Sequence, residues 1–239
     1  MIYDASFAYE VAVIMKDAIT RILGPNPEDR FWYLTLYNET YPMPALPEGQ
    51  DREDISRGIV EGIYRFSAGP YTGTDLRASL CFSGPMWSVA QEAQQLLASR
   101  WGVSAETFAV TSWSRLRIDA LEVERWNRLH PGGDPRRPLV TEVLGAGPAP
   151  VVAITDYMRS VPDQVSRFIE RPYTSLGTDG FGRSDARDAL REHFEVDAAH
   201  LVLAVLSELA RSGQLPSSVV ESAISELGVD VSRAAPFVV

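Results

Sequence analysis

Cysteine is nearly absent from this sequence, because Cys81 is the only one among 239 residues. A lone cysteine excludes a disulfide framework and also a cysteine-rich metal site. Cys81 stands between Leu80 and Phe82, and this apolar setting favours a buried strand residue over a redox group.

Acidic residues outnumber basic residues, and the sequence has no long apolar run. The chain has 22 Lys and Arg against 32 Asp and Glu, a net charge of −10, so no basic stripe exists to displace the counterions of a nucleic-acid backbone. No apolar stretch approaches the roughly 20 residues of a membrane span. Asp4, Glu10 and Lys16 interrupt the apolar core that a signal peptide would need. We therefore expect a cytoplasmic protein that binds neither nucleic acid nor membranes.

The three histidines do not form a catalytic or metal-binding pattern. His130 and His193 each end a predicted helix, where a cation is favoured by the helix dipole. His200 begins another helix and has no obvious polar neighbour. His193, Glu195 and Asp197 alternate at a spacing that matches neither one helical face nor a zinc motif. We expect structural roles for all three histidines.

Motifs of several enzyme classes are also missing. The sequence contains no Gly-x-Ser-x-Gly nucleophile elbow and no phosphate-binding P-loop. Residues 144–148, Leu-Gly-Ala-Gly-Pro, lack the third glycine of a dinucleotide-binding turn and continue into prolines instead of a helix. These absences argue against a serine hydrolase, a P-loop enzyme and a dinucleotide-binding domain.

Apolar periodicity predicts alternating helices and strands along most of the chain. Helices are predicted over residues 6–23, 85–101, 115–129, 163–169, 185–193, 200–211 and 216–227. Strands are predicted over residues 31–37, 76–82, 107–111, 140–144, 151–154 and 173–176. Strands separated by helical stretches indicate βαβ units and a mostly parallel sheet flanked by helices, an α/β fold.

The first 67 residues contain too little secondary structure for a core of their own. They hold one predicted helix, which Asp4 or Ser6 can cap, and one or two strands, of which residues 31–37 are expected to be buried. Glycines and a proline within residues 69–73 separate this part from the rest of the chain. The pattern predicts an α/β domain over residues 75–239, preceded by a piece of another domain.

A turn is predicted over residues 177–185, Gly-Thr-Asp-Gly-Phe-Gly-Arg-Ser-Asp, because its three glycines allow backbone conformations that other residues avoid. This turn should bring an aromatic ring, an arginine and two carboxylates toward one point, and a helix should start at Ser184. Ligands of open α/β sheets sit at such strand-to-helix turns. In a purely structural turn, Asp179 would bond its own backbone and Arg183 would pair with Asp185 or with a partner chain. Because a cation at a helix N-terminus is opposed by the dipole, Arg183 should need a carboxylate from Asp179, Asp185 or a partner subunit, and we expect it to serve assembly.

Three segments together resemble one family. They are residues 177–185 with the flanking residues 155–158 and 193–197, residues 37–49, and residues 110–117 with 124–131. These segments closely resemble the C-terminal region of the homodimeric pyruvate dehydrogenase E1 component, a thiamine-diphosphate enzyme of the transketolase type. The resemblance runs from Tyr9 to about Leu227, although the family's enzyme is several times longer. The chain is therefore expected to be only the last part of such an enzyme.

Two of these segments carry individual expectations. Thr40 and Pro42 stand where the family commonly has asparagine and histidine, so no role of that histidine transfers to this chain. Glu39 is retained and is expected to make an interdomain hydrogen bond. Within residues 124–131, Trp126 and Leu129 are expected to be core residues of the long helix.

The resemblance implies a transketolase C-terminal domain over residues 75–239, preceded over residues 1–67 by the end of a pyrimidine-binding domain and a linker. It implies a complete enzyme that decarboxylates pyruvate on thiamine diphosphate with Mg²⁺ and transfers the acyl group to a lipoyl acyltransferase, the E2 component. The family's cofactor-binding and catalytic motifs are absent here. We therefore assign no catalytic, cofactor-binding or metal residue, and we expect no cofactor on this chain alone.

The expected partners are the missing N-terminal E1 domains or a second E1-like subunit, together with a second copy in a homo-oligomer. Two alternatives remain open. The chain could be one piece of a split transketolase-like enzyme that transfers a two-carbon ketol unit, or a non-catalytic assembly module.

Overall fold

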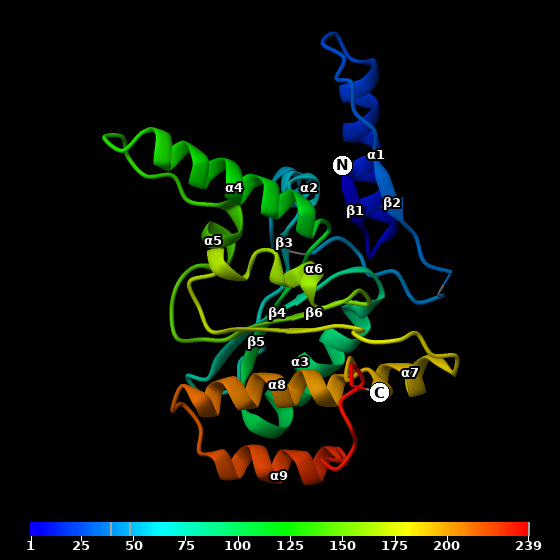
Figure 1. Ribbon diagram of the computed structural model, residues 1–239, viewed down its shortest axis with the longest axis vertical. Coiled ribbons are helices and arrows are strands. Elements are labelled where there is room, and N and C mark those ends of the chain that lie inside the picture. Colours follow the sequence, from blue (N-terminus) through cyan, green and yellow to red (C-terminus); the bar gives the residue numbers. More distant parts are fainter. Residues whose placement is uncertain (39, 48, 239) are drawn as a thin grey trace.

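The computed structural model describes residues 1–38, 40–47 and 49–238, and a five-stranded sheet lies at its centre (Figure 1). The strand order is β3-β5-β4-β6-β7, in which β4 to β7 run parallel and β3 lies antiparallel to β5 at one edge. The strands are β3 (Tyr64–Ser67), β4 (Arg77–Phe82), β5 (Ser104–Ala109), β6 (Val151–Ile154) and β7 (Tyr173–Leu176). The predicted mostly parallel sheet is confirmed.

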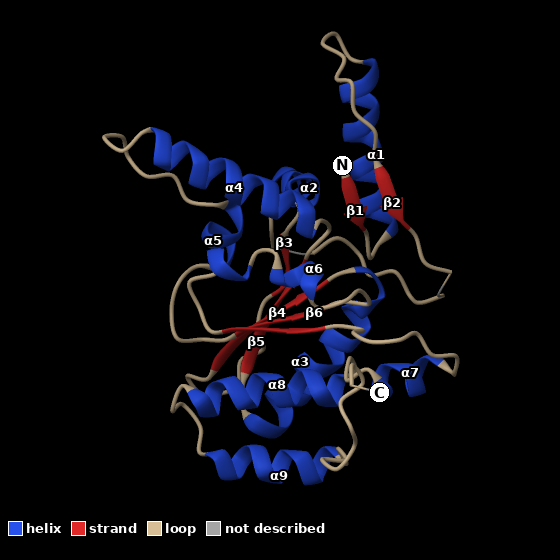
Figure 2. Cartoon of the chain, in the orientation of Figure 1, coloured by secondary structure: helices blue, strands red, loops and turns tan. Residues whose placement is uncertain are grey.

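Helices cover both faces of this sheet (Figure 2). On one face lie α3 (Trp87–Trp101) and α8 (Ala198–Arg211), with α9 (Ser217–Leu227) packed on α8; on the other lie α4 (Trp113–Leu129), α5 (Leu139–Leu144) and α6 (Ser160–Asp163). Side chains of β4 alternate between the two cores, because Leu80 and Phe82 join one apolar cluster and Cys81 joins the other. None of the helices in the described part of the chain is long and apolar enough to cross a bilayer.

The N-terminal residues form a separate small unit that projects from the rest (Figure 1). It consists of β1 (Ile2–Asp4), α1 (Ala8–Leu23) and β2 (Tyr33–Thr35), with β1 parallel to β2 in a two-stranded sheet; α2 (Arg52–Glu61) then leads back to β3. The prediction of a buried strand over residues 31–37 is wrong in length and in burial. Within the described ranges β2 pairs only with β1, so Phe31 and Tyr33 are 76% and 58% exposed.

Residues 140–144 form helix α5, not the expected strand. Val140 and Leu144 lie four residues apart, so on a helix they share one face, and both are buried in the same apolar cluster. The backbone N–H of Leu139 donates to Asp119 at 2.7 Å, which satisfies one of the donors left free in the first turn. The β-branched valines misled the prediction, because burial of one helical face outweighs their strand preference.

Other predicted boundaries shift. The helix expected over residues 163–169 is replaced by α6 and a 3₁₀ turn at Ser166–Phe168, and the backbone becomes extended at Ile169. The strand expected over residues 107–111 is β5, which begins at Ser104 because its whole length pairs in register with β4. The first helix is capped at Phe7, not by Asp4 or Ser6.

Candidate functional site

The turn of residues 177–185 lies at the carboxyl edge of the parallel sheet, directly after β7. Thr178 is fixed to the loop that follows β6, because its N–H donates to Tyr157 O at 2.9 Å and its hydroxyl donates to Asp156 O at 2.6 Å. The next helix, α7, spans Arg187–His193 and not residues 185–193 as predicted. The turn is therefore longer than expected, and its second half, residues 181–186, is exposed.

The charged and aromatic groups of the turn do not meet at one point, which corrects the prediction. The Asp179 carboxylate is held by Arg159, whose Nε lies 3.1 Å from Oδ2 and whose backbone N–H donates to Oδ1 at 3.1 Å. Asp185 accepts a hydrogen bond from the N–H of Ala186 at 2.7 Å. Phe181 is 81% exposed. Both intrachain carboxylates that were expected for Arg183 thus bind other groups.

Glycine is required at the centre of the turn. Gly180 has φ = 101°, and a Cβ there would lie 2.6 Å from the carbonyl oxygen of Pro236. The C-terminal segment therefore packs directly on the turn backbone. Beside it, the Arg159 guanidinium lies 5.2 Å from the centre of the Phe237 ring, within the range of a cation–π contact.

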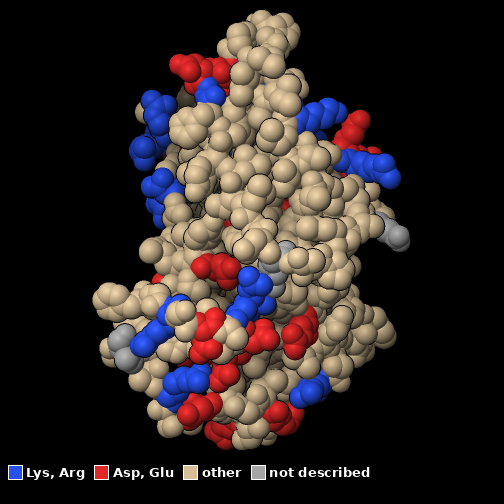
Figure 3. All heavy atoms as spheres, turned by 90° about the vertical axis from the view of Figure 1, so that its right-hand side faces the viewer, with Lys and Arg blue, Asp and Glu red and all other residues tan. Residues whose placement is uncertain are grey.

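A recess of about 310 Å³ opens between this turn and α7. We call it the arginine recess, and its principal lining residues are Asp156, Thr178, Arg183, Arg187, Arg191 and Phe194. It lies on the side of the molecule that faces the viewer in Figure 3, where acidic and basic side chains intermingle over the lower half and charged side chains of the upper half lie along its two margins. Three arginines against one aspartate make this recess positive in a chain of net charge −10.

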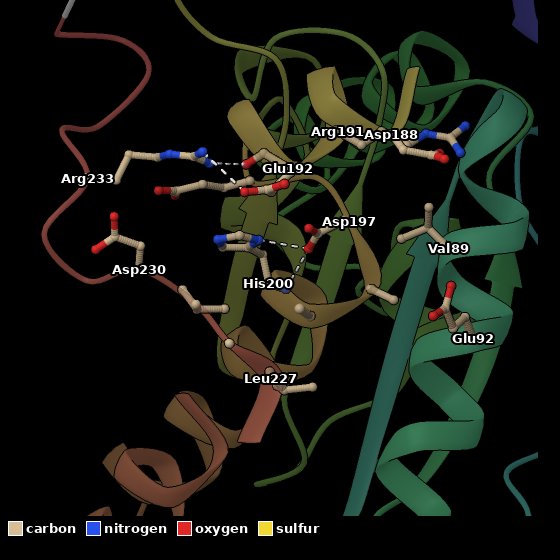
Figure 4. Close-up of a pocket in the computed structure, with 15 residues that line it drawn as sticks. Val89, Glu92, Asp188, Arg191, Glu192, Asp197, His200, Leu227, Asp230 and Arg233 are labelled. Atoms are coloured by element: carbon tan, nitrogen blue, oxygen red, sulfur yellow. Dashed lines mark hydrogen bonds and ion pairs between the residues drawn. The ribbon is translucent and has the colours of Figure 1, made fainter. Parts of the chain in front are cut away.

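A second pocket, of about 500 Å³, lies on the other side of α7, where α3, α8 and the C-terminal segment converge (Figure 4). Six carboxylates line it, with two arginines and His200; the carboxylates belong to Glu92, Asp188, Glu192, Glu195, Asp197 and Asp230. Arg233 closes one side by an ion pair of 3.1 Å with Glu192. The pocket is thus predominantly acidic and unsuited to an anion.

His200 has a polar neighbour, contrary to the sequence-based expectation. Asp197 caps α8 and accepts hydrogen bonds from the backbone N–H of His200 at 2.9 Å and from its ring Nδ1 at 2.7 Å. Burial disfavours the charged form of both groups. The hydrogen bond and the attraction between the opposite charges outweigh burial, so the pKa of Asp197 is lowered and the pKa of His200 is raised. The contact stabilises the start of α8, which is a structural role.

The other two histidines end helices as predicted. His130 follows α4, stacks on Trp126 at 4.4 Å between ring centres and contacts its carbonyl oxygen through Nδ1 at 2.8 Å. His193 is the last residue of α7 and packs edge-on against Phe194. Within the described ranges, no group of three or more His, Cys, Asp or Glu side chains could hold a metal ion.

Trp126 and Leu129 are not core residues, because the C-terminal half of α4 extends away from the sheet (Figure 1). Leu129 is 54% exposed, and Trp126 is covered by His130 on one side and by the Arg136 guanidinium, 3.9 Å from the ring centre. Cys81 is buried in β4 as predicted, and burial raises the pKa of its thiol to about 12, which makes it unreactive. Glu39 lies outside the described residues.

A buried carboxylate that the sequence analysis missed joins the N-terminal unit to the main domain. Glu10 is fully buried near the start of α1. It accepts hydrogen bonds from the N–H groups of Ser6 at 2.6 Å and Phe7 at 3.1 Å, and from the hydroxyl of Tyr64 in β3 at 2.6 Å. Burial raises its pKa to about 7, against the lowering effect of these hydrogen bonds. A glutamate at the third position of a helix is a capping signal that sequence analysis could have used.

A second buried carboxylate, Asp4, lies at the same junction. It accepts hydrogen bonds from the hydroxyls of Thr35 and Tyr37, each at 2.6 Å, and its backbone N–H donates to Thr111 O at 2.8 Å. Burial raises the pKa of Asp4. Asp4 and Glu10 thus fasten the N-terminal unit to the main domain, although Oδ2 of Asp4 is buried without a hydrogen-bond partner among the described residues.

Known sequences include similar proteins. The sequence is 42% identical over 235 residues to the pyruvate dehydrogenase E1 component of Escherichia coli and 41% identical over 234 residues to that of Mycobacterium tuberculosis. Each match covers 98% of this chain but only 26% and 25% of the relative, within the C-terminal region. The chain therefore spans about a quarter of the length of the curated relatives that it matches.

Solved structures share the fold. The transketolase from Leishmania mexicana superposes with a TM-score of 0.59 at 17% identity, over 90% of this chain and 25% of that one. A structure described as a split gene transketolase, inactive beta4 tetramer, superposes with a TM-score of 0.54 at 17% identity, over 87% of this chain and 57% of that one. The profile of the transketolase-like TK C-terminal domain matches residues 62–197. The chain therefore belongs to the transketolase-like C-terminal domain family and resembles the C-terminal region of pyruvate dehydrogenase E1 components.

Proposed function

We propose that this chain serves as the C-terminal part of a cytoplasmic pyruvate dehydrogenase E1-type enzyme. The complete enzyme would decarboxylate pyruvate on thiamine diphosphate with Mg²⁺ and transfer the acyl group to a lipoyl acyltransferase. The observation that carries this proposal is the 42% identity to an E1 component over 98% of the chain. The transketolases that share the fold are only 15–17% identical.

The described residues do not fit a site for the Mg²⁺–diphosphate group, because no cluster of metal-ligating side chains lies among them. We therefore assign no step of the reaction to this chain. Its proposed contribution is to complete the subunit fold and to support the contact between subunits of a homo-oligomer. The cofactor, the catalytic groups and the site that meets the lipoyl acyltransferase would come from N-terminal E1 domains or from a second E1-like subunit.

The N-terminal unit supports this contribution. Parallel sheets are found almost only with both faces covered, whereas the parallel pair β1–β2 exposes Ile2 and Tyr33 by 53% and 58%. On α1, Ile19 and Leu23 are 53% and 77% exposed. Such a face suits the remainder of a pyrimidine-binding domain. The division into a pyrimidine-domain end over residues 1–67 and a C-terminal domain over residues 75–239 is part of this proposal.

A chimera tests the proposal. The C-terminal quarter of the Escherichia coli relative is replaced by this chain, and the oxidative decarboxylation of pyruvate is measured with the remaining components of the complex. We expect activity from the chimera and none from the truncated relative alone. A folded, oligomeric chimera that binds the cofactor but does not turn over pyruvate would contradict the proposal.

The second candidate is one piece of a split transketolase-like enzyme, which transfers a two-carbon ketol unit. The similarity to the split gene transketolase supports it, since this chain covers 57% of that shorter protein. The DNA upstream of the Met1 codon separates the possibilities. A continuous reading frame favours a piece of a longer E1 chain. A neighbouring gene for the missing domains favours a split enzyme. If both are absent, a non-catalytic assembly module is favoured.

A further inference from the structure

The arginine recess concentrates positive charge beside the carboxyl edge of the sheet. Arg183, Arg187 and Arg191 line it, and Asp156 is its only acidic lining residue among those described. The formal charge of these four side chains is therefore +2, and Arg191 also lines the neighbouring pocket, which is predominantly acidic. A local excess of positive charge in a chain of net charge −10 raises the concentration of anions at this place.

The three arginines come to the recess from two elements. Arg187 and Arg191 lie four residues apart on α7, so their side chains emerge from the same face of the helix. Arg183 approaches from the turn, whose backbone is held by the packing of Gly180 on Pro236. Arg187, Arg191 and Asp156 each already have an interaction partner. A guanidinium has five N–H donors, so each can serve a second partner.

Arg183 makes no ion pair with any residue in the described part of the chain. The two carboxylates nearest to it in sequence are already engaged, Asp179 by Arg159 and Asp185 by the N–H of Ala186. Its guanidinium thus lines the recess with its donors free for a ligand.

The chemistry of the recess identifies the class of anion. Arginine forks match the oxygen geometry of phosphate and carboxylate, and several arginines together favour the doubly charged phosphate. Phe194 and Val196 are buried and line the recess with Leu190 as an apolar wall. A volume of about 310 Å³ is at the small end of ligand sites.

We propose that the arginine recess is a binding site for a phosphate dianion, either inorganic phosphate or the phosphoryl group of a small phosphate monoester. Arg183 supplies the donor fork from the turn, and Arg187 and Arg191 supply the charge from α7. The apolar wall accepts the small organic part of a monoester. The site lies at the edge of the sheet where ligands of open α/β folds bind.

The test uses the complete 239-residue chain and amide chemical shifts measured by NMR during titration. The probes are inorganic phosphate and glycerol phosphate, with glycerol as the phosphate-free counterpart. We expect saturable shifts confined to residues 177–196 with both phosphate probes and none with glycerol. Arg183→Ala should weaken phosphate binding at least about tenfold, because a hydrogen-bonded charge is lost. Tighter binding of glycerol phosphate would identify a monoester as the ligand, and equal binding would identify phosphate itself.

Arg57→Ala is the matched control, because Arg57 is an exposed arginine on α2 that pairs only with Asp54 at 2.5 Å among the described residues. It should leave phosphate binding unchanged. The absence of saturable shifts near the turn would overturn the proposal, as would equal phosphate affinity in Arg183→Ala and the unchanged chain. Sedimentation supplies a further overturning outcome. If Arg183→Ala weakens self-association and phosphate has no effect on either protein, the recess holds a carboxylate of a second subunit instead.

Discussion

Tyr64 donates a hydrogen bond of 2.6 Å to the fully buried carboxylate of Glu10, across 54 residues of sequence. Because Tyr64 is the donor in this bond, its oxygen accepts the hydrogen bond that joins it to the hydroxyl of Tyr9 at 2.7 Å. The chain of three groups connects the start of α1 with β3, the antiparallel edge strand of the main sheet. The N-terminal unit is thus attached to the main domain through a buried ionisable group.

The stability of the chain should depend on pH through Glu10. Its pKa is raised by burial from 4.5 to about 7, so the folded state binds a proton more tightly than the unfolded state does. The stabilisation is therefore fully present below pH 4.5 and is lost as pH rises through about 7. It should amount to on the order of 3 kcal/mol. Urea unfolding of Glu10→Gln, measured between pH 4.5 and 7, should show none of this pH-dependent stabilisation. If the variant keeps the pH dependence of the unchanged chain, Glu10 is not its source.

Removing the hydroxyl of Tyr64 should destabilise the chain. Tyr64→Phe leaves the Glu10 carboxylate buried with one donor fewer, which should lower the free energy of unfolding by about 1–3 kcal/mol. Tyr71→Phe is the matched control, because Tyr71 is 96% exposed, and it should have no measurable effect. Equal stability of the two variants in urea would show that the Tyr64–Glu10 bond contributes nothing.

Residues 1–67 should be the less stable part of the fold. The strand β2 pairs only with β1 among the described strands, whereas β6 lies between two neighbours in the five-stranded sheet. Hydrogen exchange should therefore be faster in residues 31–37 than in Val151–Ile154. Equal protection of the two segments in a monomer would contradict this expectation.

The isolated chain should neither bind thiamine diphosphate with Mg²⁺ nor decarboxylate pyruvate. The family's metal–diphosphate motif has no counterpart in the sequence, and no described cluster of side chains fits a metal ion. Calorimetric titration with the cofactor and Mg²⁺ checks this directly. A saturable heat that requires Mg²⁺ at micromolar cofactor would show that the chain carries a cofactor site of its own.

The family and the alternation of strands and helices could be recognised from the sequence, because both depend on local patterns. The apolar runs of β4, β6 and β7 and the periodicity of α3, α8 and α9 fall close to their predicted ranges. The strand predicted over residues 140–144 is wrong because the β-branched residues Val140, Thr141 and Val143 fit a strand locally. Only the burial of Val140 and Leu144 on one helical face decides for α5.

The sequence by itself determined the α/β class, the resemblance to one family and the place of the turn after β7, since glycine spacing and apolar periodicity are local properties. Only the tertiary structure decided which charged groups meet. Asp179 pairs with Arg159, not with its own turn, and Glu10 meets Tyr64 from another element. Contacts between residues far apart in sequence depend on how the sheet and helices pack, and no spacing rule within one segment encodes them.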